Sequence, residues 1–305
     1  MTANTLKPLL LLTLLGFNGA VYLVLGKFVT DAGGNGLLLA LGQAAGAAAV
    51  LGPLTARRGE RLGRSRNIVA FYAGGAVIGI LLPAVATFWV LPHIGAGLMA
   101  VSIATSPIMT AVIAQLVGIE KLNLQKGLGI AGAFAGAALI VGGAPDPSVV
   151  REPLWLAAGL LVPFFLACGN VYRTVFWPEG HSAPQVGAGI GLLGIAVIAP
   201  MAILTGGPAA ALGFGIGAAA ALIGFVALNG FNALPYYHLQ QIAGPVYLSL
   251  LSHMMAAFGI LLGILVFGER FSLRDIGGVA LVLTGVALVT LSRARQARRA
   301  AAAGS

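Results

Sequence analysis

Seven polar side chains within long apolar segments are the residues of this sequence that could bind a solute or transfer a proton. They are Asn18, Asn170, Asn229, Asn232, Tyr236, Ser252 and His253. An isolated amide or imidazole in hydrocarbon costs several kcal/mol unless it is hydrogen-bonded or faces water. These side chains should therefore either tie neighbouring helices together or line a polar cavity.

His253 is the candidate best suited to proton chemistry, because it is the only ionisable residue expected near the middle of an apolar span. A histidine titrates near neutral pH, so this imidazole could carry a proton or donate a hydrogen bond to a substrate carboxylate. The alternative is a neutral imidazole bonded to a neighbouring helix. His93, His181 and His238 fall near the expected membrane interfaces, so no metal-binding cluster is predicted.

The other candidates also have structural alternatives. Asn18 and Asn170 fall at similar depth in two apolar segments, where they could line a cavity or join helices. Ser252 could hydrogen-bond to its own helix, as buried serines commonly do. Tyr236 falls at the inner end of its segment, where tyrosine often anchors a helix at the interface and where it could equally line the mouth of a cavity.

Membrane-spanning helices must position these side chains, because the composition leaves little polar surface for water. The sequence is 59% hydrophobic and 8% charged, whereas a soluble domain carries about a quarter charged residues. Crossing a bilayer takes about 20 apolar residues per helix. Cutting the sequence at its charged, Pro-rich and Gly-rich breaks predicts ten spans, near residues 6–27, 34–55, 67–90, 94–117, 126–143, 153–175, 183–205, 211–235, 243–267 and 274–292.

The basic residues that give the net charge of +9 are grouped in a way that indicates membrane topology. We therefore expect no nucleic-acid partner. Five arginines lie between residues 57 and 66, and four lie between residues 293 and 299. With ten spans, both groups fall on one side, which the positive-inside rule assigns to the cytoplasm. We expect a multi-pass protein in the lipid bilayer of the inner (plasma) membrane, with both termini cytoplasmic.

Two similar segments, 149 residues apart, predict an internal repeat. They read EKLNLQKGLGI from Glu120 and ERFSLRDIGGV from Glu269. Each repeat would contain five spans, and because five is odd, the second copy would cross the membrane in the opposite orientation. We expect an all-α integral membrane protein in which residues 1–143 form the first repeat, 144–152 a linker, 153–292 the second repeat and 293–305 a basic cytoplasmic tail.

Three short motifs accompany the repeat: Leu15-Gly16-Phe17-Asn18 in the first span, Pro107 thirteen residues before Glu120, and Gly268-Glu269-Arg270 before a glycine-spaced helix. With these motifs the sequence resembles, over residues 6–292, the EamA-type families of the drug/metabolite transporter superfamily, which often show Trp-Gly-x-Asn in the first helix. The departures are Leu15 in place of the family's tryptophan and Ala256 as the counterpart of Pro107. The resemblance implies alternating access without ATP, around a cavity lined by spans one, three, four, six, eight and nine.

The positions of the charged residues argue against two transport mechanisms. All eight acidic residues lie at predicted helix ends or in loops, so no buried carboxylate is expected to exchange a proton for an organic cation. A nucleotide-sugar carrier would need basic residues in its cavity, and none is predicted at depth. We therefore expect a secondary transporter of small metabolites, such as amino acids or related compounds, working by facilitated diffusion or weak proton coupling through His253. The resemblance favours export.

Two other functional classes stay open: a sensor or scaffold without transport, and a carrier for sugars or nucleotide-linked compounds. An enzyme is not expected, because the sequence has no phosphate loop, no nucleophile elbow, no paired carboxylates and no zinc-binding helix motif. We also expect no cofactor and no bound metal. The single cysteine, Cys168, excludes an intramolecular disulfide. A monomer or weak homodimer that binds a small-molecule substrate is the expected state.

Overall fold

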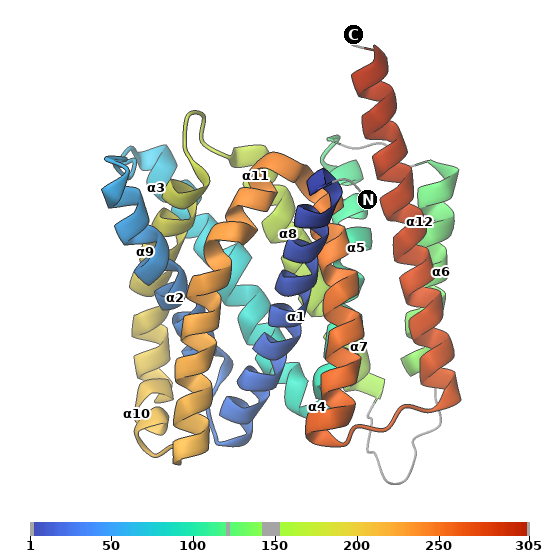
Figure 1. Ribbon diagram of the computed structural model, residues 1–305. Coiled ribbons are helices and arrows are strands. Elements are labelled where there is room, and N and C mark those ends of the chain that lie inside the picture. The colour runs from blue at the N-terminus through green and yellow to red at the C-terminus, as the bar shows by residue number, and fades with distance from the viewer. Residues whose placement is uncertain (1–2, 120–122, 142–152, 304–305) are drawn as a thin grey trace.

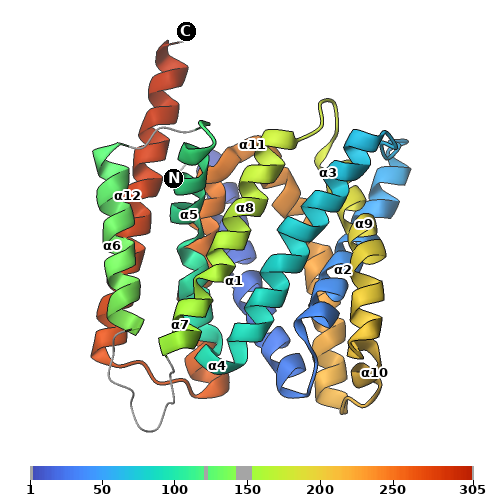
Figure 2. The same ribbon diagram turned by 180° about the vertical axis from the view of Figure 1, so that it is seen from behind.

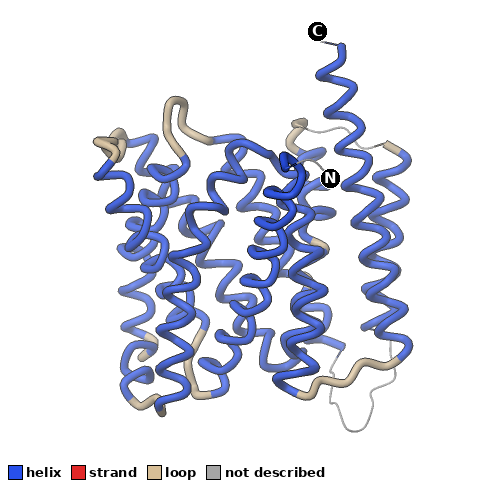
Figure 3. Tube along the Cα trace, in the orientation of Figure 1, coloured by secondary structure: helices blue, strands red, loops and turns tan. Residues whose placement is uncertain are grey.

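The computed structural model describes residues 3–119, 123–141 and 153–303, and helices account for nearly all of them. Figure 3 shows these helices joined by short connections, with no strand in the described part of the chain. The predicted all-α class is confirmed. The predicted linker at 144–152 lies outside the described residues.

The helices follow one another with short connections that leave no room for a further domain within the described ranges. In the first half they are α1 (Ala3–Asp31), α2 (Gly36–Arg57), α3 (Arg66–Ala76), the π-helix η1 (Val77–Leu81), α4 (Leu82–Ala104), α5 (Ser106–Leu116) and α6 (Leu124–Val141). In the second half they are α7 (Pro153–Gly159), α8 (Leu161–Phe176), α9 (Ala183–Leu204), α10 (Gly207–Leu212), α11 (Ile216–Phe267) and α12 (Leu273–Ala303).

Six helical segments among the described residues are long and apolar enough to cross a membrane. They are Thr13–Asp31, Gly36–Arg57, Arg66–Leu116, Pro153–Phe176, Ala183–Leu204 and Ile216–His238. Segment Arg66–Leu116 contains 51 residues, about twice the length that one crossing needs. Length and apolar composition thus make the chain a multi-pass membrane protein.

Two pairs of predicted spans are joined without the expected loop. Figure 2 shows the chain descending through α3 and α4 and rising again through α5, and the turn contains Gly95, whose φ is 81° and ψ 167°. In the second half, α11 is assigned as one helix of 52 residues. Figure 1 shows that it rises and then turns back on itself. The loop predicted between residues 235 and 243 is therefore absent, because the chain reverses within helical backbone.

Two prolines lie where the regular α-helix is interrupted. Pro83 follows the π-helix η1, and Pro107 follows a break at Thr105 that separates α4 from α5. Proline lacks the backbone donor of an α-helical turn and its ring crowds the preceding turn. Both prolines thus lie directly after an interruption of regular α-helix.

Glycines bring helix backbones together at the two edges of the bundle. Helix α2 packs on α9, where a Cβ added to Gly191 would lie 2.9 Å from the backbone nitrogen of Ala48. Helix α6 packs antiparallel to α12 (Figures 1 and 2), where a Cβ added to Gly136 would lie 2.6 Å from the carbonyl oxygen of Gly278. Only residues without a side chain allow such contact. Gly191 and Gly136 therefore allow two helix pairs to pack closely.

Candidate functional site

Two of the predicted site residues form a hydrogen bond across the bundle. The amide nitrogen Nδ2 of Asn18, on α1, donates to Oδ1 of Asn232, on α11, at 2.9 Å. The two residues are 214 positions apart in the sequence, and Asn18 is buried. For Asn18 the structure therefore shows a bond that ties two helices together.

Alanine substitutions should reveal the coupling between these two amides. Asn18→Ala and Asn232→Ala each remove the bond, so the double variant should be more stable than the sum of the two losses predicts. We expect a coupling free energy of about 0.5–1.5 kcal/mol, as found for polar pairs between membrane helices. Reversible unfolding of the four proteins in mixed micelles measures it. Strictly additive effects would show that the bond contributes nothing.

A second polar cluster, which we call the arginine cluster, contains Asn170 and Arg173 on α8 and Tyr236 on α11. The guanidinium nitrogen Nη2 of Arg173 donates to Oδ1 of Asn170 at 2.8 Å and to the hydroxyl of Tyr236 at 3.1 Å. The Tyr236 hydroxyl in turn lies 3.4 Å from Asn170 Oδ1. The guanidinium carbon is 5.9 Å from the centre of the Tyr236 ring, a cation–π distance. Two predicted site residues, Asn170 and Tyr236, thus accept hydrogen bonds from the charged guanidinium of Arg173.

Arg173 is the member of this cluster that the sequence reasoning missed. Its side chain is only 3% exposed, so the expectation that no basic residue lies within the bundle is wrong. The sequence places it three residues before the end of α8, where an arginine looks like an interfacial topology signal. A better signal was its spacing from Asn170, because residues three apart lie on one face of a helix.

The three remaining predicted site residues are Asn229, Ser252 and His253, all on α11. The Nδ2 of Asn229 donates to the carbonyl oxygen of Phe225 at 2.7 Å, so this amide bonds to its own helix. Ser252 is buried on α11. The side chain of His253 lies outside the described residues, and its role in proton transfer stays a prediction.

An aromatic cluster lies one helical turn beyond Asn18 and joins α1, α4 and α11. The Tyr22 ring centre is 4.8 Å from that of Phe225 and 5.3 Å from that of Phe88, and the two phenylalanine rings are 5.7 Å apart. Such distances are typical of packed aromatic pairs. The rings fill the space between the three helices on one side of the Asn18–Asn232 bond.

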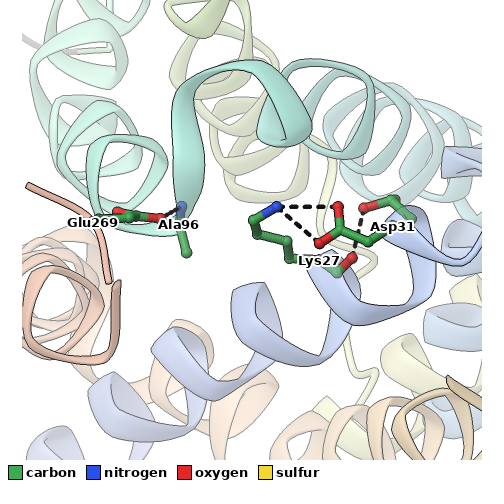
Figure 4. A network of polar contacts seen from close by, with 5 residues as sticks. Lys27, Asp31, Ala96 and Glu269 are labelled. Atoms are coloured by element: carbon green, nitrogen blue, oxygen red, sulfur yellow. Dashed lines mark hydrogen bonds and ion pairs between the residues drawn. The ribbon is translucent and has the colours of Figure 1, made fainter. Parts of the chain in front are cut away.

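Glu269 stabilises the break in α4 from the connection between α11 and α12. Its carboxylate accepts a hydrogen bond from the backbone nitrogen of Ala96 at 2.6 Å (Figure 4) and another from the backbone nitrogen of Gly97 at 2.9 Å. The left-handed backbone of Gly95 begins a new helical segment, and the first N–H groups of a helix attract an anion. Glu269 lies between two helices, as the sequence predicts, and the helical segment whose start it stabilises belongs to α4 rather than to α12, which follows it. Glu120 lies outside the described residues.

Other described acids also lie at helix ends. Asp31 pairs with Lys27 in the last turn of α1 at 2.9 Å (Figure 4), and Asp275 accepts from the backbone nitrogen of Ser272 at 2.9 Å. Within the described ranges, no three His, Cys, Asp or Glu residues are grouped so that they could hold a metal ion. Among the described residues, the buried polar side chains are mostly amides and hydroxyls, and the buried charged ones include Lys126, Arg173 and Asp275.

Comparison with known proteins finds a transporter family whose sequences resemble the first part of the chain. Residues 6–142 match the EamA-like transporter family, which confirms the resemblance to EamA-type transporters. A solved structure described only as the crystal structure of a protein superposes with a TM-score of 0.60 over 93% of this chain and 98% of that chain. At 19% identity, this likeness concerns the fold alone. No curated protein sequence matches the chain.

Proposed function

We propose that the chain is a secondary transporter, because residues 6–142 match the EamA-like family. The members of this family are membrane transporters of the drug/metabolite transporter superfamily. It exports small metabolites, such as amino acids or related compounds, by alternating access without ATP. The observation that supports this best is the arginine cluster, a charged group with neutral polar partners inside an apolar helical bundle. Polar groups at such positions are costly and commonly mark a solute pathway.

The transport cycle would use ten spans arranged as two inverted five-helix repeats. Both halves contain a helical reversal without a loop, in α3 to α5 and in α11. The fifth helices of the proposed repeats, α6 and α12, pack antiparallel through Gly136 and Gly278, which belong to the two segments that the repeat aligns. Contact between equivalent helices is what a two-fold axis in the membrane plane would produce.

The orientation in the membrane follows from the positions of the basic residues. Figure 1 shows both chain ends on the same side of the bundle as the connection between α2 and α3. This connection contains Arg58, Arg61 and Arg64, and the C-terminal end of α12 carries further arginines. The positive-inside rule assigns this side to the cytoplasm, and we propose an inner-membrane location on this basis.

Release of metabolites by intact cells tests the proposal. Cells that overproduce the protein should accumulate at least one class of small metabolite in the medium, relative to cells with an empty vector. Proteoliposomes loaded with that compound should then lose it without ATP. A strict ATP requirement would contradict the mechanism. If the metabolite content of the medium equals that of the empty-vector cells, the result would contradict export and favour the sensor or scaffold alternative.

A further inference from the structure

We propose that the connection between α2 and α3 binds the headgroups of anionic phospholipids. Five exposed arginines, which we call the basic patch, would make the contact: Arg57, Arg58, Arg61, Arg64 and Arg66. The positive-inside rule uses the same arginines to orient the chain, but it requires only their number and no bound lipid. The inference therefore goes beyond both the topology and the proposed transport function.

The basic patch lies close to the membrane surface. Helix α2 ends at Arg57, and α3 begins at Arg66. Both helices belong to segments that are long and apolar enough to cross a membrane. The short connection at residues 58–65 cannot carry its side chains far from the bilayer, and Figure 1 shows it at one end of the bundle. The guanidinium groups are thus within reach of phospholipid headgroups, because arginine side chains extend toward the interface.

Two hydrogen bonds from the second half of the chain fix the backbone of the connection. The hydroxyl of Ser182 donates to the carboxylate of Glu60 at 2.6 Å, and Nε2 of Gln185 donates to the carbonyl oxygen of Arg61 at 3.2 Å. The side chain of Leu62 packs against the hydrophobic core. The arginines therefore extend from a fixed backbone, and binding a headgroup would order side chains alone, which lowers its entropic cost.

The surroundings do not balance the positive charge of the basic patch. In the part of the chain that the structure describes, none of the five guanidinium groups forms a hydrogen bond or an ion pair. This connection and the one that contacts it, between α8 and α9, contain two acids, Glu60 and Glu179, so five arginines and two carboxylates leave a charge of +3. The first turn of α3 carries no acid, and a positive charge such as that of Arg66 is unfavourable there. Helix stability therefore does not explain this arginine.

The chemistry of the basic patch favours an anionic phospholipid. A guanidinium can bind two oxygens of one phosphate through parallel N–H donors, and such charge-assisted hydrogen bonds are strong. A zwitterionic headgroup brings a cation, which the arginines repel. A soluble phosphate would have to come from dilute solution, whereas headgroups lie beside the connection at high local concentration. Clusters of four or more basic residues next to a membrane span are typical of anionic-lipid binding.

Thermal unfolding of the full-length protein in detergent tests the proposal. The probe is short-chain phosphatidylglycerol, and phosphatidylcholine of the same chain length is the reference. Phosphatidylglycerol should raise the Tm at a lower concentration than phosphatidylcholine does. Added salt should reduce this difference, because it screens exposed charges. Glycerol phosphate, which lacks acyl chains, should leave the Tm unchanged at the concentration at which phosphatidylglycerol saturates.

Substitution of two exposed arginines assigns the effect to the basic patch. Arg61→Gln combined with Arg64→Gln should raise the half-saturating concentration of phosphatidylglycerol about fivefold or more, since one arginine near an anionic surface contributes about this factor. Arg298→Gln combined with Arg299→Gln is the matched control. It removes the same charge from the C-terminal part of α12, which projects beyond the other helices (Figure 1). The control should leave the half-saturating concentration unchanged.

Several results would overturn the inference. Equal responses to the two lipids, or a difference that salt does not reduce, would show that the acyl chains determine binding. A response to glycerol phosphate at the same concentration would assign the basic patch to soluble anions. Wild-type binding by the folded Arg61/Arg64 variant, or an equal loss in the control, would exclude a specific role for the patch.

A second double variant keeps the test decisive if the Arg61/Arg64 variant does not fold. Arg58→Gln combined with Arg66→Gln removes two other exposed arginines of the basic patch. It should weaken phosphatidylglycerol binding by a similar factor, and wild-type binding would again exclude the patch. All these measurements use purified protein and involve no transport, so failure of this inference leaves the proposed function intact.

Discussion

Gly46→Ala should destabilise the protein, whereas Gly52→Ala, in the same helix, should stabilise it slightly. A Cβ added to Gly46 would collide with the carbonyl oxygen of Val226 and would lie 2.9 Å from the backbone nitrogen of Gly230. Both atoms belong to the backbone of α11 and cannot rotate away. Overpacking of this kind costs about 1–3 kcal/mol or more. The Tm of each variant, purified in detergent, measures the effect.

Gly52 is the matched control because nothing lies within 4 Å of a Cβ built there. Alanine is favoured over glycine within a helix by up to about 1 kcal/mol, so the two substitutions should have opposite signs. Gly46→Ala should also disturb the site, since Gly230 lies two residues before Asn232. Equal Tm values for the two variants would mean that α2 and α11 do not touch at Gly46.

The parts of the fold that depend on neighbouring residues were predictable from the sequence. Glycines spaced four residues apart indicate surfaces for close helix contact, and Gly46, Gly136 and Gly191 all meet the backbone of another helix. Pro83 and Pro107 marked interruptions, because proline acts on the turn that precedes it. Such features need only the local sequence and the bilayer as a solvent.

Features that depend on distant partners were not predictable. The bond from Asn18 joins residues 214 apart, and both alternatives for this residue fitted the sequence equally well. The sequence places a reversal between residues 90 and 94, next to Gly95, but it does not reveal the residue that stabilises this reversal, because Glu269 comes 174 residues after Gly95. Arg173 was misread because an arginine near a helix end looks the same whether it faces the interface or the bundle interior.

The polar contacts divide the bundle into two ends with different chemistry. Near the proposed cytoplasmic end, Arg173 and Tyr236 join α8 to α11 through a charge and neutral partners. Near the other end, Glu269 joins the connection after α11 to α4 through backbone N–H groups. In an alternating-access cycle, each end must open in turn. The contacts of Glu269 would thus have to break when the far end opens.

Glu269→Ala should loosen the helix break at Gly95 more than any other substitution of a described acidic residue. The change removes both acceptors of the Ala96 and Gly97 N–H groups. Each hydrogen bond to a charged group is worth about 1.5–3 kcal/mol, so we expect the loss of both to lower the free energy of unfolding by about 3–6 kcal/mol. Glu269→Gln keeps one oxygen acceptor and should lose about half as much.

Hydrogen exchange at residues 96 and 97 provides the local readout, because these amide protons are the ones that Glu269 protects. Exchange should accelerate in Glu269→Ala and remain slow in Glu179→Ala, since Glu179 is exposed in the connection after α8. Faster exchange across the whole protein, with no excess at these two amides, would indicate general destabilisation. Unchanged exchange at Ala96 would contradict the contact. A selective effect at these two amides would establish that Glu269 stabilises the turn between the two segments of α4.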